Sequence, residues 1–283
     1  MIVIKSFENI EKSLAVLPPS IIEKFKIGEY KQFFFENDIK NTKNLFFIFC
    51  SFFQFIAKEE NIKIDENVLV DYTTLNIADY FSRIFYDGVF DHKESNKLPI
   101  ANLCYTEYIL LSDALSIDIR QAIAKTEPYY YCQNVLPIGK IDIDYAKKLN
   151  ENWTDCTLGF ATSLYTINHF VSKYIKNSFW SDFFYFYLLW RQILDDTTDF
   201  SEDYQNKELK SIGILALCEK FNKFKHINLK NPLTAINFQL YVLNNYNKIY
   251  ADLIKRFEIE LSTKMKVDDF YKTIEKIENF LPS

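Results

Sequence analysis

Five carboxylates fall within nine positions, directly behind one of the most apolar runs of the chain. If the apolar run at residues 179–190 is a helix that continues through them, Asp195 and Asp199 are four residues apart and lie on one face. Like charges at that spacing repel, and a cation relieves the repulsion. Mg²⁺ suits such oxygen ligands, because it usually binds one or two carboxylates together with substrate phosphates. The spacing therefore suggests a Mg²⁺ site for a diphosphate. The carboxylates are Asp195, Asp196, Asp199, Glu202 and Asp203.

A solvated helix end is the alternative explanation of this segment, because an acidic run after an apolar helix commonly faces water. The helix macrodipole disfavours carboxylates near a C-terminus, where Lys or Arg would be stabilising. The charge pattern therefore favours a binding site over a purely structural helix end.

Residues 192–199, Gln-Ile-Leu-Asp-Asp-Thr-Thr-Asp, resemble the second aspartate-rich motif of the trans-isoprenyl diphosphate synthases, where a Gln precedes DDxxD by three positions. The resemblance extends over roughly residues 30–215. It implies an all-α fold, with a single isoprenoid-synthase-like domain over residues 1–283 and roughly ten or more helices around a central apolar cavity. It also implies Mg²⁺ as cofactor, held by two aspartate-rich motifs on facing helices.

A partial match to the first aspartate-rich motif lies upstream. Asp87 and Asp91 keep the pair spaced by four residues, but Gly88 replaces the second Asp of the family pattern. Residues 96–99, which include Lys97, stand where the family has Arg-Arg-Gly and a nearby Pro. Residues 111–115 look like the Gly-Asp-x-Leu segment of the family.

The segment that holds isopentenyl diphosphate in the family is eroded here. Residues 38–45 resemble Gly-Lys-Arg-x-Arg-Pro, with Lys40 kept and Lys43 in place of an Arg. Tyr80 stands at the position of a family His that serves the same co-substrate, and residues 153–154 lack the Lys-Thr pair. Lys207 lies near where a Lys follows the second motif.

The expected activity is that of a class I terpene synthase-like enzyme. The resemblance implies ionisation of one allylic prenyl diphosphate, followed by cyclisation or water capture with release of diphosphate. In this interpretation the metal-binding and catalytic residues are Asp195, Asp196, Asp199, Asp87 and Asp91. The substrate-binding residues are Gln192, Lys207, Lys40, Lys43 and Lys97.

Two alternatives stay open. One is a trans-prenyltransferase that elongates with isopentenyl diphosphate, in which lysines replace the family's arginines as phosphate partners. The other is a non-catalytic regulatory subunit of an active prenyl diphosphate synthase, which Gly88 favours and the intact second motif disfavours. Dimerisation is common in the resembled family, so a homodimer, or a heteromer with an active synthase, is an expected assembly.

Composition excludes several other classes. Only 5 Gly and 7 Pro in 283 residues argue against a turn-rich β fold and against a Gly-rich phosphate loop. A net charge of −5 gives no basic face for nucleic acid. Five scattered Cys without a CxxC pair predict buried thiols in a reducing compartment. Without a signal-peptide pattern or an apolar run long enough to span a bilayer, we expect a cytoplasmic protein without a membrane span.

Helical periodicity dominates the chain, and no strand alternation stands out. It predicts a short helix and then a longer one within residues 7–36, separated at Pro18 and Pro19. Much later in the chain, residues 126–143 are predicted to form an irregular loop or lid. Two helices are predicted from residue 232 to the end, with Asp268 and Asp269 at the start of the last. The other predicted helices cover residues 45–59, 69–90, 100–124, 144–163, 165–176, 179–203 and 210–224.

Overall fold

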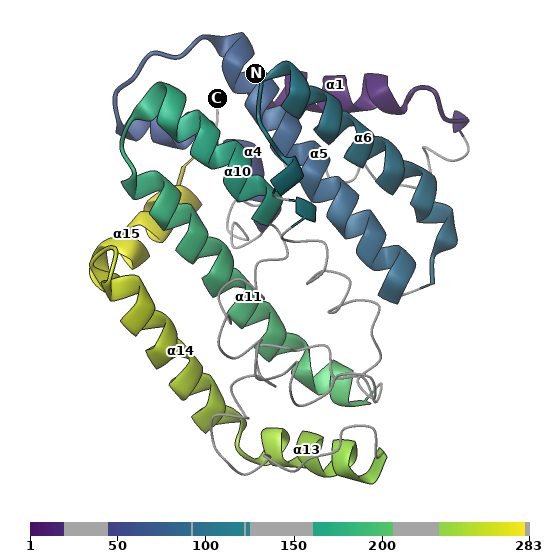
Figure 1. Ribbon diagram of the computed structural model, residues 1–283, viewed down its shortest axis with the longest axis vertical. Coiled ribbons are helices and arrows are strands. Elements are labelled where there is room, and N and C mark those ends of the chain that lie inside the picture. Colours follow the sequence, from purple (N-terminus) through teal and green to yellow (C-terminus); the bar gives the residue numbers. More distant parts are fainter. Residues whose placement is uncertain (20–44, 92, 122, 125–160, 206–231, 281–283) are drawn as a thin grey trace. The chain divides into compact units, whose positions relative to one another are not determined.

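The computed structural model describes residues 1–19, 45–91, 93–121, 123–124, 161–205 and 232–280 (Figure 1). Every regular element in those ranges is a helix, which confirms the all-α prediction. None of the described helices is long and apolar enough to cross a membrane. The described residues form two compact units. The first comprises residues 1–122, 162–184 and 268–283, and the second comprises 123–161 and 185–267. The single-domain organisation therefore stays a prediction.

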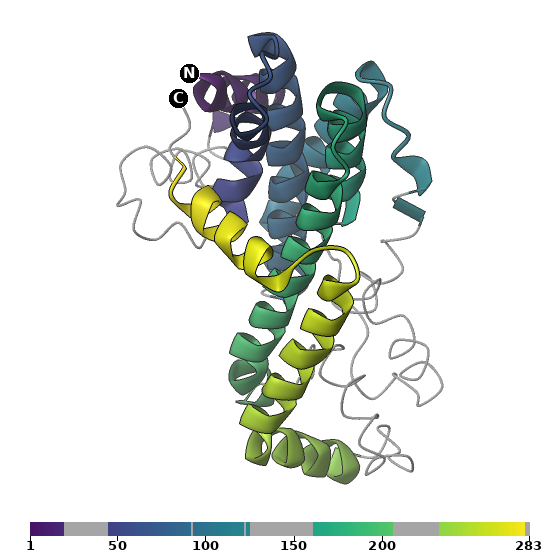
Figure 2. The ribbon, with the colours of Figure 1, turned by 90° about the vertical axis from the view of Figure 1, so that its left-hand side faces the viewer.

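The first unit is built around α5 (Glu66–Asp91). This helix packs against α1 (Ile2–Leu14), α4 (Leu45–Glu59) and α6 (Leu98–Ala114). Figure 1 shows α5 running beside α6, and Figure 2 shows α4 next to it. The bounds of α4 are those that the sequence predicts, and its residues 48–57 are buried.

Aromatic rings fill the core of the first unit, and α4 supplies many of them. Phe52 lies 4.7 Å from Phe184, and Phe53 lies 4.7 Å from Phe170, measured between ring centroids. Phe53 also meets the buried Tyr72 edge to face at 5.4 Å. Such tilted and edge-to-face pairs add to the stabilisation that burial of the rings provides. Many of the aromatic rings in the first unit therefore stabilise contacts between its helices.

The helix α10 (Ala161–Phe170) continues into a π-helical turn at Val171–Ile175 and ends at Lys176 in the left-handed conformation. The prediction of a helix boundary between residues 163 and 165 is wrong, because α10 runs through this point without a break. Thr162, Ser163 and Thr166 are fully buried there, and the Thr162 and Ser163 hydroxyls donate hydrogen bonds to Asp79 on α5.

Two other boundaries differ from the prediction. The helix predicted at 100–124 ends at Ala114, and Ser116 then adopts a positive φ of 61°. The C-terminal segment holds three helices where two were predicted: α13 (Pro232–Asn244), α14 (Tyr246–Ser262) and α15 (Val267–Glu278). Asp268 and Asp269 do lie in the first turn of α15, where their charges favour the positive end of the helix dipole.

The second unit contains α13, α14 and the later part of α11 (Phe179–Gln205). Phe186 of α11 packs against Phe257 of α14, with 6.0 Å between ring centroids. The Tyr246 hydroxyl donates a hydrogen bond of 2.8 Å to the backbone carbonyl of Thr197. These contacts tie one side of α11 to α14.

Candidate functional site

The second aspartate-rich segment lies on α11, which runs without a break from Phe179 to Gln205. The predicted continuation of the apolar helix through this segment is therefore confirmed. Asp195 and Asp199 are one turn apart on that helix, and Gln192 lies one turn before Asp195. The Asp195 side chain is exposed and Gln192 is half-buried. The side chains of Asp196 and Asp199 lie outside the described part of the structure.

The opposite side of α11 faces the protein. Ile193 and Thr197 are buried there, and the Thr197 hydroxyl donates to the carbonyl of Ile193 at 2.8 Å. Since Tyr246 binds the Thr197 carbonyl on this side, Asp195 is left on the side that faces solvent. An exposed carboxylate on an anchored helix is accessible to a hydrated cation, which fits the oxygen-rich donor set that Mg²⁺ prefers.

The first aspartate-rich segment forms the last turns of α5. Asp87 is half-buried, and Asp91 is the last residue of the helix. Their spacing of four residues within one helix is confirmed, whereas the Asp91 side chain lies outside the description.

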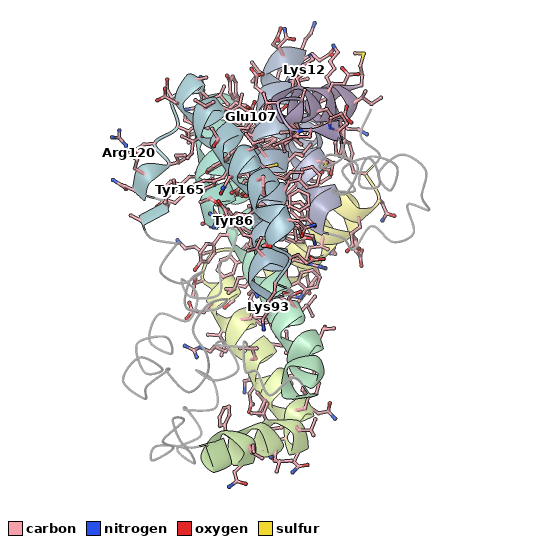
Figure 3. The ribbon with its side chains drawn as sticks, turned by 90° about the vertical axis from the view of Figure 1, so that its right-hand side faces the viewer. Lys12, Tyr86, Lys93, Glu107, Arg120 and Tyr165 are labelled. Atoms are coloured by element: carbon pink, nitrogen blue, oxygen red, sulfur yellow. The ribbon has the colours of Figure 1, made fainter. Side chains whose placement is uncertain are left out.

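The connection from α5 to α6 folds back onto α5 at Gly88. Lys93, labelled in Figure 3, has a positive φ of 56°, and the Glu94 amide donates to the Gly88 carbonyl at 3.1 Å. Lys97 then forms an ion pair with Glu94. As a result, the Lys97 side chain lies across the helix at the glycine.

Lys97 lies where a side chain at position 88 would begin. A Cβ at position 88 would lie 2.7 Å from Cδ and 2.8 Å from Nζ of Lys97, which is closer than such atoms approach in proteins. The lysine ammonium therefore occupies the volume in which the family's second Asp would begin. An Asp at position 88 would therefore require the Lys97 side chain to move.

Tyr80, which replaces a family His, belongs to the aromatic core. Its side chain is buried, with its ring 5.6 Å from that of Phe49 and 6.0 Å from that of Phe81. It therefore serves packing in this chain.

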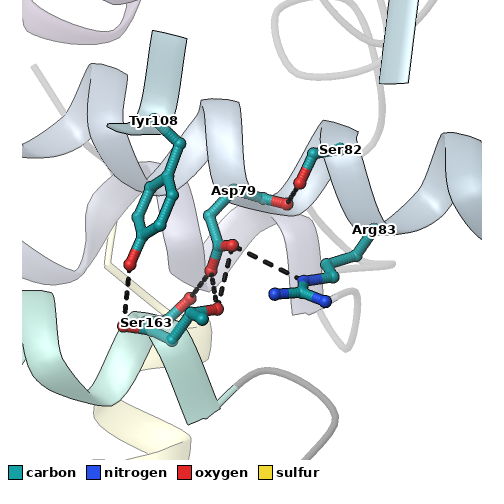
Figure 4. Close-up of polar contacts among 6 residues, drawn as sticks. Asp79, Ser82, Arg83, Tyr108 and Ser163 are labelled. Carbon is teal, nitrogen blue, oxygen red and sulfur yellow. Dashed lines mark hydrogen bonds and ion pairs between the residues drawn. The ribbon is translucent and has the colours of Figure 1, made fainter. Parts of the chain in front are cut away.

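A buried charge cluster that the sequence reasoning missed lies on the same helix (Figure 4). Asp79 has no exposed surface, and Oδ2 accepts hydrogen bonds from Thr162 at 2.7 Å and from Ser163 at 2.6 Å. The Nε of Arg83, itself only 2% exposed, lies 3.7 Å from Oδ1. Buried charges are costly unless they are paired and hydrogen-bonded, and this carboxylate is both. Asp79 and Arg83 four residues apart inside an apolar helix are the sequence signal that could have indicated the pair.

Tyr108 of α6 completes the cluster. Its hydroxyl donates to the Thr162 carbonyl at 3.2 Å. Burial, together with the negative charge of Asp79, raises the pKa of Tyr108 well above its usual range. Tyr108 is therefore a neutral hydrogen-bond donor in the folded protein and holds α6 to α10.

The other residues singled out in the sequence are three lysines and the cysteines. Lys40, Lys43 and Lys207 lie outside the described residues. Cys50 and Cys104 are buried free thiols, and burial raises the pKa of Cys104 to about 12. Within the described ranges, no group of three or more His, Cys, Asp or Glu side chains converges as a metal site. Because three of the five proposed ligands are not described, the Mg²⁺ assignment stays a prediction.

Comparison with known proteins adds no assignment. The chain matches no protein-family model, and no curated protein or solved structure is significantly similar to it.

Proposed function

We propose that this chain is a class I terpene synthase-like enzyme that acts on one allylic prenyl diphosphate. The observation that carries the proposal is the unbroken course of α11, which is anchored through Thr197 and leaves Asp195 facing solvent. Asp199 follows one turn later on the same helix. This is the arrangement that a carboxylate pair needs to share a cation with a diphosphate.

Bound Mg²⁺ would supply charge neutralisation for the leaving diphosphate. Asp195, Asp196 and Asp199, all on α11, would hold it, and Asp87 with Asp91 on α5 is a separate, weaker candidate pair for metal. Gln192 and Lys207 would contact the diphosphate. The apolar and aromatic side chains of a pocket would shield the carbocation from water, with ring faces turned toward the positive charge.

The position of Lys97 supports a reaction of one diphosphate over chain elongation. Elongation needs cations for a second diphosphate, and Lys97 is one of the three lysines expected to replace arginines of the resembled family as phosphate partners. Its ammonium is paired with Glu94 and lies across Gly88. A phosphate would have to compete with Glu94 for this ammonium, which makes the prenyltransferase the less favoured candidate.

The test is diphosphate release from geranyl, farnesyl and geranylgeranyl diphosphates with Mg²⁺, each with and without isopentenyl diphosphate, together with extraction of organic products. We expect release without the co-substrate, accompanied by a hydrocarbon or an alcohol. Release that requires isopentenyl diphosphate and yields longer diphosphates would identify a prenyltransferase. No release in either condition would favour the regulatory subunit.

A substitution tests the metal assignment directly. Asp195→Asn should lower turnover at least ~100-fold, since loss of a ligand or of its supporting contacts has effects of this size. The matched control is Asp268→Asn, which makes the same change at an exposed carboxylate in the first turn of α15. If Asp195→Asn leaves turnover and Mg²⁺ dependence as they are in the control, the assignment is wrong.

A further inference from the structure

An open pocket of about 710 Å³ lies between the end of α4 and the second half of α15, within the first unit. Aromatic and charged side chains from both helices line it. Its volume falls within the ~300–1,000 Å³ that is usual for ligand pockets. The lining that the structure describes includes no member of the aspartate-rich segments or of the Asp79 cluster, so the pocket is separate from the candidate site.

The inner wall of the pocket is aromatic and held in place by its neighbours. Phe55 is only 2% exposed, and its ring meets the rings of Phe280 and Trp180 edge to face, with 5.5 Å and 5.7 Å between centroids. The Trp180 indole donates a hydrogen bond of 2.6 Å to Glu60, the residue after α4. Phe280 is only half-buried, so part of its ring is open to the pocket. Such a wall favours a ligand with a flat ring, because aromatic rings gain from tilted and offset contacts with one another.

One ion pair links the two helices at the pocket. Nζ of Lys276 on α15 lies 2.8 Å from Oε2 of Glu59 on α4. The two charges neutralise each other and leave the remaining charged side chains of the lining to a ligand.

Two lysines of the lining, Lys58 and Lys272, have no anionic partner among the described residues. The Lys58 ammonium lies 5.2 Å from the ring centroid of Phe280, a cation–π contact that occupies none of its three N–H donors with an acceptor. Lys272 is exposed on α15 and makes no ion pair within the part of the chain that the structure describes. A hydrogen-bond acceptor in the pocket would therefore find unused, charged donors on both helices.

The charge balance of the lining indicates the charge of the ligand. Three lysines and two glutamates line the pocket, so positive charges outnumber negative ones by one. A monoanion makes the pocket neutral, whereas a phosphate monoester or a diphosphate would bring further negative charge toward Glu59 and Glu275. The two oxygens of a carboxylate can accept from two separate donors. An aromatic ring that carries one carboxylate therefore matches both the wall and the charged side chains.

We propose that the pocket between α4 and α15 binds a small aromatic monocarboxylate. The ring of the ligand packs against Phe55 and Phe280, and its carboxylate accepts hydrogen bonds from Lys58 and Lys272. Because the pocket is open and its lysines are solvated, we expect a Kd of roughly 1 mM for a ligand with two fused rings. The site is independent of the proposed catalytic function, since a prenyl diphosphate carries more negative charge than the pocket accepts.

Saturation-transfer NMR of the full chain with naphthoate tests the site. Naphthamide has the same ring without the charge, acetate has the charge without the ring, and naphthyl phosphate carries a second negative charge. We expect naphthoate to bind at least about threefold more tightly than each of the other three. Equal or tighter binding of naphthamide or acetate would overturn the proposed recognition, and tighter binding of naphthyl phosphate would show a phosphate site instead. No saturation transfer from naphthoate up to ~10 mM would overturn the proposal altogether.

Substitutions locate the binding on the protein. Lys58→Gln and Lys272→Gln should each weaken naphthoate binding about two- to fivefold, which is the effect of one charge contact at an exposed site. The matched control is Lys12→Gln, the same change at an exposed lysine of α1, and it should leave the Kd unchanged. Glu275→Gln removes a like charge from the lining and should tighten binding by up to about fivefold. If either pocket lysine behaves like the control, or if Glu275→Gln weakens binding, the proposed contacts are wrong.

Discussion

The buried pair of Asp79 and Arg83 gives a sharp test of how the first unit is held together. Asp79→Asn keeps the size of the side chain and removes its charge. The Arg83 guanidinium, only 2% exposed, would then lie 3.7 Å from a neutral amide. Breaking a buried ion pair from one side costs about 3–5 kcal/mol, because the other charge stays desolvated. The change also weakens hydrogen bonds from Thr162 and Ser163, which are worth ~1.5–3 kcal/mol each when the acceptor is charged.

Urea unfolding followed by helical circular dichroism measures the effect. We expect Asp79→Asn to lower the free energy of unfolding by about 3–5 kcal/mol, or to prevent folding if the protein has less to lose. The exposed Asp113→Asn is the matched control and should change it by less than about 0.5 kcal/mol.

A double variant separates charge from shape. Asp79→Asn combined with Arg83→Met removes the uncompensated charge, so it should be more stable than Asp79→Asn alone. The coupling should lie within the ~0.5–3 kcal/mol range of residues in contact. A loss below about 1 kcal/mol for Asp79→Asn, at an unchanged dependence on urea, would refute the argument that this pair is a buried structural element.

Two further predictions concern the same unit. In a Lys97→Ala background, which clears the space above the glycine, Gly88→Ala should stabilise α5 by up to about 1 kcal/mol. With Lys97 present, the gain in the free energy of unfolding should be smaller. Equal effects in the two backgrounds, measured by urea unfolding, would contradict the close contact between Lys97 and position 88. Burial lowers the pKa of His169 below its ordinary 6.5, and Lys173 adds to this, so the unfolded chain binds the proton first as the pH falls and stability should decline below about pH 6.5. His169→Gln should flatten the decline in thermal unfolding midpoint between pH 7 and 5, and an unchanged slope would show that other groups cause it.

Apolar runs and helical periodicity predicted several helices with nearly correct bounds. α4 has the predicted limits, and α5 extends only a few residues beyond the predicted 69–90. Long apolar runs leave the backbone few alternatives, because its polar groups must be satisfied while the side chains are buried. The same reasoning predicted that the helix beginning at Phe179 continues past Asp195, as α11 does.

The ends and interruptions of helices were harder to predict from the sequence. The end of α6 at Ala114 has no Gly or Pro behind it, and Ser116 takes the left-handed conformation that Gly usually provides. The π-helical turn at Val171–Ile175 likewise has no local signal in the sequence. Tertiary packing, which can override local propensity, is the physical reason that such boundaries escape periodicity.

The sequence by itself determined that the chain is helical and that Asp195 and Asp199 share one helix, because both follow from residue types and spacing along one segment. Only the tertiary structure decided that Asp79 is a buried structural anion and that Gly88 makes room for Lys97. These roles depend on which side chains other helices bring to the same point, as Thr162 is brought to Asp79 from 83 positions away. The energy of a buried charge or a close approach is set by those neighbours, and a single segment does not contain them.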